Sequence, residues 1–69
     1  MKLYEAQYIE RASGKSIRVG GIEAVDYSAA RRVGWEMLAE QQGGNVGDAI
    51  RRFNVINLKV VNGKGRIDL

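Results

Sequence analysis

The sequence predicts an α+β fold in which one helix packs on one face of a small antiparallel sheet and leaves the other face open to solvent. Three observations favour it. The chain begins with alternating polar and apolar residues, its centre repeats apolar residues at helical spacing, and an Asn-Gly pair separates two apolar runs near its end. The expected order of elements is ββαββ, with residues 1–69 forming a single domain.

The first hairpin is predicted to pair residues 2–11 with residues 16–24. Tyr4, Ala6 and Tyr8 alternate with polar residues, as in a half-buried strand. The tract Ala12-Ser13-Gly14-Lys15 supplies the turn, because Gly and Ser are frequent in turns.

The register set by this turn is consistent only if the second strand is irregular. If Arg11 pairs with Ser16 across the turn, Tyr8 lies opposite Val19, but the apolar residues beyond Gly20-Gly21 are then out of phase with Val19. One extra residue at the glycine pair, a β-bulge, repairs the phase and places Ile22 opposite Ala6. The hairpin then presents its apolar side chains on one face.

The helix is predicted to start after Asp26, a good N-cap, and to stop at the two glycines that follow Gln42. Gly34 lies on the apolar stripe although glycine is unfavourable in helices, which indicates a close approach to a strand. The whole stripe comprises Tyr27, Ala30, Val33, Gly34, Met37, Leu38 and Gln41.

The second hairpin follows the loop Gly43–Gly47 and a short helical turn from Asp48, as its cap, to Phe53. Residues 55–61 form the third predicted strand, and a two-residue turn at Asn62-Gly63 leads into a fourth. This turn pairs Val61 with Lys64, Leu58 with Ile67, and Ile56 with Leu69, and it directs Ile56, Leu58, Ile67 and Leu69 to the core.

The composition favours a binding protein over an enzyme. The chain has no His and no Cys, the residues that most often titrate near neutral pH, bind transition metals or act as nucleophiles. We therefore expect no catalysis, no metal and no cofactor. The absence of Cys fits a cytoplasmic protein, and no stretch resembles a signal peptide or a membrane span. The net charge of +3 suggests anionic or nucleic-acid-linked partners.

Two surfaces are candidates for partner binding. The open sheet face is predicted to carry a basic group, with Glu5 facing Glu23 elsewhere on it, and its alternative interpretation is a solvated strand face. The helix flank offers Arg31 beside Trp35, which lies off the apolar stripe; Trp35 either shields the core or is an exposed anchor. The predicted basic group comprises Arg18, Lys59, Lys64 and Arg66, with Asn57 on the same part of the face, and the arginine doublets Arg31-Arg32 and Arg51-Arg52 are weaker candidates.

The run Ile22–Val33, between two predicted hairpins, resembles the hairpin-helix-hairpin layout of small phage-encoded proteins, among them anti-CRISPR inhibitors of type I surveillance complexes. This resemblance implies a stoichiometric inhibitor that acts in the host cytoplasm. Its partner would be a CRISPR surveillance complex, which is a ribonucleoprotein, and it would block the binding of target DNA to that complex. The positive net charge departs from the acidic DNA mimicry of part of that class.

A second resemblance implies a different function. The tract Gly14–Gly21 in a helix-backed sheet resembles the arm-type DNA-binding domains of phage integrases and the plant AP2 domain. It implies direct DNA contact by Arg11, Lys15 and Arg18, with affinity that falls steeply as salt rises. The exposed edge of a small sheet allows either a monomer or a homodimer.

Overall fold

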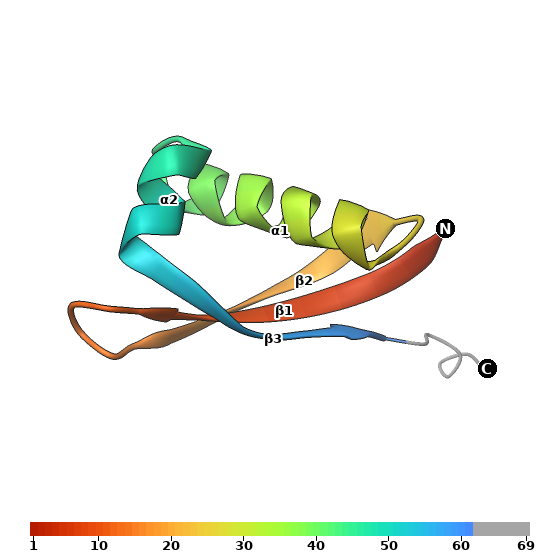
Figure 1. Ribbon diagram of the computed structural model, residues 1–69, viewed down its shortest axis with the longest axis horizontal. Helices are drawn as coiled ribbons and strands as arrows, with labels where there is room; N and C mark the ends of the chain where they lie inside the picture. The colour runs from red at the N-terminus through yellow and green to blue at the C-terminus, as the bar shows by residue number, and fades with distance from the viewer. Residues whose placement is uncertain (62–69) are drawn as a thin grey trace.

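A computed structural model of the protein describes residues 1–61 and confirms the α+β class (Figure 1). A three-stranded antiparallel sheet, in the order β2-β1-β3, has both helices on one face. The predicted Asn62-Gly63 hairpin and fourth strand lie outside the described residues. The elements in chain order are β1 (Lys2–Glu10), β2 (Ser16–Ala24), α1 (Tyr27–Gln42), α2 (Val46–Arg52) and β3 (Phe53–Val60).

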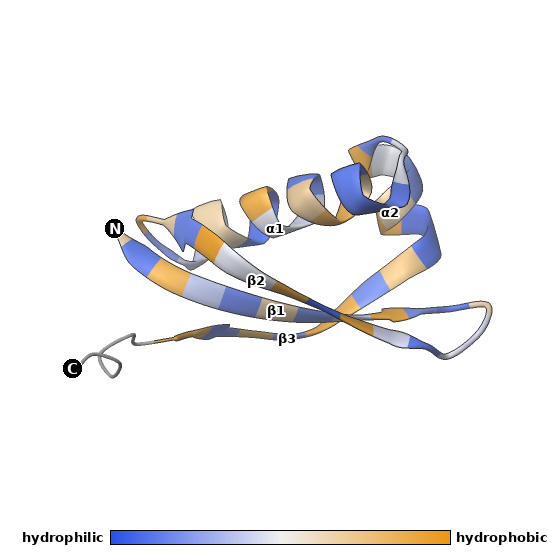
Figure 2. Cartoon of the chain, turned by 180° about the vertical axis from the view of Figure 1, so that it is seen from behind, coloured by the Kyte–Doolittle hydropathy of each residue, from blue (hydrophilic) through white to orange (hydrophobic). Residues whose placement is uncertain are grey.

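Strand β1 is the centre of the sheet and supplies the middle of the core. Its alternating residues Tyr4, Ala6 and Tyr8 are buried beneath the helices. Figure 2 shows that hydrophilic and hydrophobic residues are interspersed along the strands. Burial of these side chains against α1 is the main source of stability in a chain without disulfides. The buried core comprises Tyr4, Ala6, Tyr8, Val19, Ile22, Ala24, Ala30, Leu38, Ala39, Ala49 and Phe53.

The predicted bulge in β2 is confirmed. Ala6 pairs with Val19 and Tyr4 with Ile22, so both glycines between Val19 and Ile22 lie opposite a single residue of β1. Gly21 has a φ of 72°, which a residue with a Cβ adopts only at a cost. The bulge keeps Val19 and Ile22 on the helix side of the sheet, where both are buried.

The register of this hairpin differs from the prediction by two residues. Tyr8 pairs with Ile17, not with Val19, and Ile9 pairs with Ser16. The reason is a turn that begins one residue earlier than predicted: β1 ends at Glu10, whose N–H donates to the Lys15 carbonyl at 2.8 Å, so Arg11 belongs to the turn. A shift of two residues leaves every side chain on its predicted face.

Strand β3 contains a second bulge, which corrects the prediction that Ile56 faces the core. Gln7 pairs with Asn57 and Tyr8 with Val55, so Ile56 has no partner in β1 and its surface is 53% exposed. Val55 and Leu58 face the helices and are half-buried. Each outer strand therefore has one extra residue relative to the central strand.

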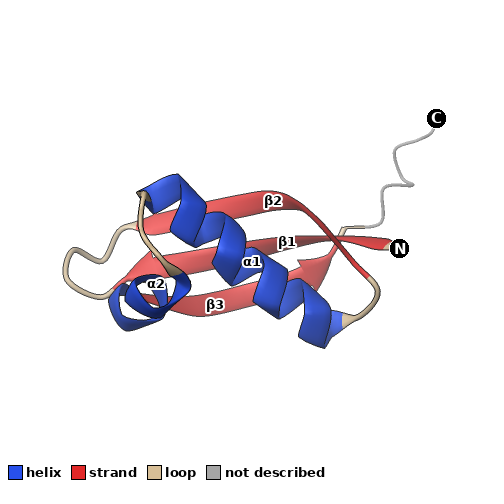
Figure 3. Ribbon diagram, turned by 90° about the horizontal axis from the view of Figure 1, so that it is seen from above, coloured by secondary structure: helices blue, strands red, loops and turns tan. Residues whose placement is uncertain are grey.

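Helix α1 begins and ends as predicted. The Asp26 carboxylate accepts the Ala29 N–H at 2.9 Å, and the chain leaves the helix at Gly43 in the left-handed region. Gly34 lies directly over β1, since a Cβ built there would be 2.5 Å from the Tyr8 hydroxyl oxygen. Figure 3 shows α1 crossing the sheet diagonally.

The buried face of α1 is rotated relative to the predicted stripe. Ala39 is buried and Trp35 is partly buried against the core, whereas Gln41 and Tyr27 are exposed. The face that packs on the sheet is therefore centred on Ala30, Gly34 and Leu38 and extends toward Trp35.

Helix α2 is longer than the predicted turn and has a different cap. The cap is Asn45, not Asp48, because Asn45 Oδ1 accepts the Asp48 N–H at 2.9 Å. Asp48 lies in the first turn instead and pairs with Arg51. Phe53 is only 1% exposed; it caps the end of α2, where its N–H donates to the Ala49 carbonyl, and it also opens β3.

Candidate functional site

The open face of the sheet has a strip of charge that crosses all three strands. Glu5 of β1 lies between Arg18 of β2 and Lys59 of β3, with O–N distances of 3.7 and 3.8 Å. The prediction that Arg18 and Lys59 share this face is confirmed. The expected pairing of Glu5 with Glu23 is wrong, because Leu3 lies opposite Glu23 and Glu5 lies opposite the bulge.

This strip is closer to neutral than the sequence suggested. The two cationic side chains are 67% and 59% exposed, and exposed ion pairs contribute about 0–1 kcal/mol each. They still place one carboxylate between two positive charges, so the face offers an anion less attraction. The other predicted members of the basic group, Lys64 and Arg66, lie outside the described residues.

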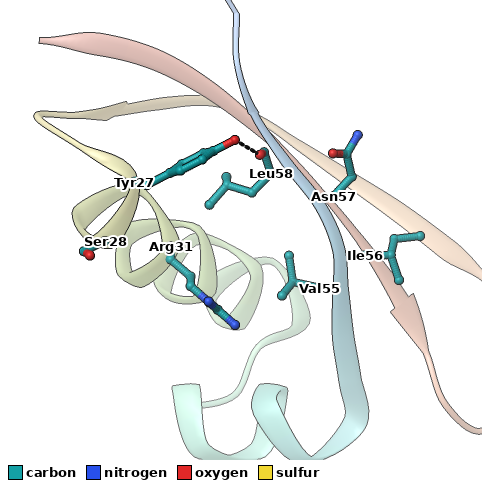
Figure 4. Close-up of a pocket in the computed structure, with 7 residues that line it drawn as sticks. All are labelled: Tyr27, Ser28, Arg31, Val55, Ile56, Asn57 and Leu58. Carbon is teal, nitrogen blue, oxygen red and sulfur yellow. Dashed lines mark hydrogen bonds between the residues drawn. The ribbon is translucent and has the colours of Figure 1, made fainter.

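A groove separates the first half of α1 from β3, and we call it the α1–β3 groove. It has a volume of about 350 Å³ and its walls combine apolar side chains with one guanidinium group (Figure 4). In Figure 4 the side chains of Val55 and Leu58 point toward the helix and that of Ile56 points away. The lining residues are Tyr27, Ser28, Arg31, Val55, Ile56, Asn57 and Leu58.

The groove continues past Tyr27 toward the end of β3. A second hollow of about 270 Å³ is lined by Lys2, Tyr4, Asp26, Tyr27 and Val60. The Tyr27 ring lies between the two hollows, 5.5 Å from the Tyr4 ring, and its hydroxyl donates to the Leu58 carbonyl. Tyr27 is 55% exposed and Val60 is 48% exposed, so apolar surface reaches solvent along this side.

The outer edge of β3, defined by the backbone of Leu58 and Val60, faces away from β1. The Val61 N–H donates to the Leu3 carbonyl at 2.7 Å, so Val61 directs its backbone groups toward β1. Alternation along an antiparallel strand then directs those of Lys59 to β1 and those of Leu58 and Val60 outward. The bond from Tyr27 to the Leu58 carbonyl agrees with this assignment. Within residues 1–61, β3 is paired on one side only.

Arg31 is the cation of the α1–β3 groove. The ion pairs among residues 1–61 give it no carboxylate partner, whereas Arg18, Arg51, Arg52 and Lys59 all have one. The charge of Arg31 also affects a buried residue of the core, Tyr8. Burial raises the pKa of the Tyr8 hydroxyl, and the positive charge of Arg31 offsets part of that rise. Within the described part of the chain, Arg31 thus acts on Tyr8 through its charge and forms no ion pair.

Trp35 packs on the core beside Arg31. Its ring centroid lies 4.9 Å from that of Tyr8, with an angle of 55° between the rings, a favourable tilted arrangement. The Tyr8 ring contacts Trp35, and the Tyr8 hydroxyl approaches Gly34, the preceding residue of the helix. The structure thus places Trp35 as the sequence interpretation of a core shield requires, with part of its surface left at the helix flank.

The corner where the first turn meets α2 uses its charged residues to hold the fold together. Arg11 donates to Asn54 Oδ1 at 2.9 and 3.2 Å and to the Ile50 carbonyl at 3.3 Å. Glu10 accepts from Ser13 at 2.7 Å and from Arg52 at 3.1 Å, and these contacts lower its pKa. Arg11 and the Arg51-Arg52 doublet are therefore engaged within the molecule.

Sequence reasoning missed the α1–β3 groove, although one signal pointed to it. Phe53 and Val55 are out of phase with Leu58 and Val60, the same break in alternation that revealed the bulge in β2. The prediction that Ile56 faces the core left this break in alternation, and so the bulge in β3, unrecognised. Of the predicted site residues, the groove brings in Arg31, while Trp35 lies one helical turn away and Arg18 and Lys59 lie on the opposite face.

Neither helix of the described residues has the length and the apolar composition that a membrane-spanning helix needs. Comparison of the chain with protein-family models, with curated proteins and with solved structures finds no match in any of the three.

Proposed function

We propose that this protein is a non-enzymatic binding protein. It is an anti-CRISPR-like inhibitor that binds a CRISPR surveillance complex stoichiometrically and prevents the complex from binding its target DNA. The α1–β3 groove is the surface through which it binds. One observation carries the proposal: exposed apolar side chains, a guanidinium without a carboxylate partner and an outward-facing strand edge occur together along one side of the described residues.

The chemistry of the groove supports a macromolecular partner. Contiguous apolar surface with a polar rim is typical of protein interaction sites, and Tyr and Arg are enriched among residues that dominate binding energy. Tyr27 and Arg31 are both on the first two turns of α1, whose Asp26 cap and contact with Leu58 fix its position. A partner would thus meet a preorganised surface, which lowers the entropic cost of binding.

The choice of target follows from the resemblance of Ile22–Val33 to the phage-encoded inhibitors. Direct DNA binding by the sheet has less support from the geometry. Arg11 is held by Asn54 and Ile50, and Arg18 shares its surroundings with Glu5, so two of the three cations expected to contact DNA already interact within the chain.

The test is a titration of a purified type I surveillance complex with this protein, read as loss of target duplex binding. We expect inhibition to saturate at a fixed ratio, and Arg31→Glu to weaken it. Arg32→Glu is the matched control, because it makes the same charge change one residue along the helix on a side chain that does not line the groove.

Three outcomes would overturn the proposal. Inhibition at strongly substoichiometric amounts would indicate turnover. Salt-sensitive binding of random duplex DNA in the absence of the complex would favour the DNA-binding interpretation. Loss of inhibition in Lys59→Glu but not in Arg31→Glu would move the interface to the open sheet face.

A further inference from the structure

We infer that the outer edge of β3 takes up an extended segment of the partner protein as an additional strand, and that this segment carries an acidic side chain for Arg31. This inference rests on the proposed function and specifies how the α1–β3 groove is used. Strand addition joins two features that a helical or globular ligand would not use together, the backbone edge that has no partner strand among residues 1–61 and the row of hollows beside it.

The backbone of β3 provides the ladder for such a strand. Leu58 and Val60 direct their N–H and C=O groups away from β1, as the bond from the Val61 N–H to Leu3 requires. The Tyr27 hydroxyl occupies one of these groups, the Leu58 carbonyl. A carbonyl oxygen has two lone pairs, so it can accept a second bond from an incoming strand.

The groove provides the pockets. Alternate side chains of an added strand would point to the helix side of the sheet, next to Val55 and Leu58 in one hollow and Val60 in the next. The Tyr27 ring separates the two hollows. Their volumes, about 350 and 270 Å³, are near the lower limit of small-ligand pockets, which fits separate side chains better than one bulky ligand.

Charge selects an acidic segment over a second copy of this chain. Arg31 lines the groove without a carboxylate partner among residues 1–61, and a carboxylate can accept two of its N–H bonds. Pairing β3 with β3 of another copy would bring two such arginines to the same face and join two chains of net charge +3. Like charges placed together disfavour that arrangement.

The test uses full-length protein and a fluorescein-labelled, end-capped peptide, Thr-Val-Thr-Glu-Thr-Val-Thr, whose Val-Glu-Val face matches the groove. We expect it to bind at least about tenfold more tightly than the same peptide with Lys in place of Glu. Arg31→Glu should reverse this preference, whereas Arg32→Glu should keep it. In an antiparallel ladder the N–H groups of the two Val residues and of Glu face β3, so a peptide N-methylated at these three residues cannot complete the ladder and should not bind.

Amide hydrogen exchange identifies the edge itself. The Leu58 and Val60 amides should exchange quickly in the free protein and become protected when the peptide binds. Protection in the free protein that is independent of concentration would mean that residues 62–69 already occupy the edge. Protection that grows with protein concentration would mean that a second copy does, and either result overturns the inference.

The peptide and the surveillance complex separate the two proposals. If the complex is inhibited but no peptide binds, the strand-addition inference is wrong and the proposed function stands. If the peptide binds as expected but the complex is unaffected, the edge is a binding site and the proposed target is wrong.

Discussion

Replacing Gly34 with alanine tests the closest contact between α1 and the sheet. In an exposed helix this change stabilises by about 1 kcal/mol, because alanine is the better helix former. Here the new Cβ would lie 2.5 Å from the Tyr8 hydroxyl oxygen, short of ordinary contact at 3.4 Å by 0.9 Å. Tyr8 is 1% exposed and packed against Trp35, so its ring has little freedom to withdraw.

Overpacking of this kind costs about 1–3 kcal/mol. Subtracting the propensity gain leaves a net destabilisation of about 0–2 kcal/mol for Gly34→Ala. The clash comes from the hydroxyl alone, since the next Tyr8 atom, Cζ, is 3.8 Å from the built Cβ. In a Tyr8→Phe background only Ile22 Cδ1, at 3.3 Å, remains close, so Gly34→Ala should become neutral or stabilising by up to about 1 kcal/mol.

The assay is urea denaturation of four proteins: the parent, both single variants and the double variant. The two single changes should not be additive, with a coupling of about 1–3 kcal/mol in favour of the double variant. A stabilised Gly34→Ala single variant would refute the close approach of helix and strand. An effect of Gly34→Ala that is the same with Tyr and with Phe at position 8 would show that the hydroxyl is not the obstacle.

Three further predictions concern the bulge, the turn and the helix cap. Gly21→Ala should destabilise by about 1–2 kcal/mol because of its positive φ, while Gly20→Ala, whose Cβ meets no atom within 4 Å, should cost less by thermal denaturation. Ser13→Ala should raise the lowered pKa of Glu10, as measured in an NMR titration. The contacts of Glu10 stabilise the fold at pH values above its ordinary pKa of 4.5, and this stabilisation is lost as the pH falls through the lower pKa of Glu10 in the folded protein. Asp26→Ala should cost about 1 kcal/mol in urea denaturation, and an unchanged midpoint would contradict the cap.

The features that could be predicted from the sequence are those that depend on residues close together in the chain. The bulge at Gly20-Gly21 was predictable because apolar residues on either side of it could not otherwise share a face. The helix boundaries were predictable because Asp26 and Gly43 satisfy backbone groups that a helix leaves free. Each of these depends on chemistry within a few residues of the feature.

Other features depend on partners distant in sequence and were missed. The pairing of Tyr8 with Ile17 could not be separated from pairing with Val19, because a shift of two residues leaves the faces unchanged. The ion pairs of Glu5 depended on that register and on which strand is central. The rotation of α1 that brings Trp35 onto Tyr8 follows from its diagonal crossing of the sheet, which helical periodicity alone does not specify.

The central position of β1 has a consequence for folding during synthesis. β1 pairs with β2 early, but its other side pairs with β3, through contacts as remote as Tyr4 with Val60. Until β3 leaves the ribosome, β1 presents an uncovered strand edge next to apolar side chains, a combination prone to aggregation. A chain that ends before Phe53 lacks β3 and keeps this edge of β1 uncovered, so it should aggregate more readily than a chain that includes β3.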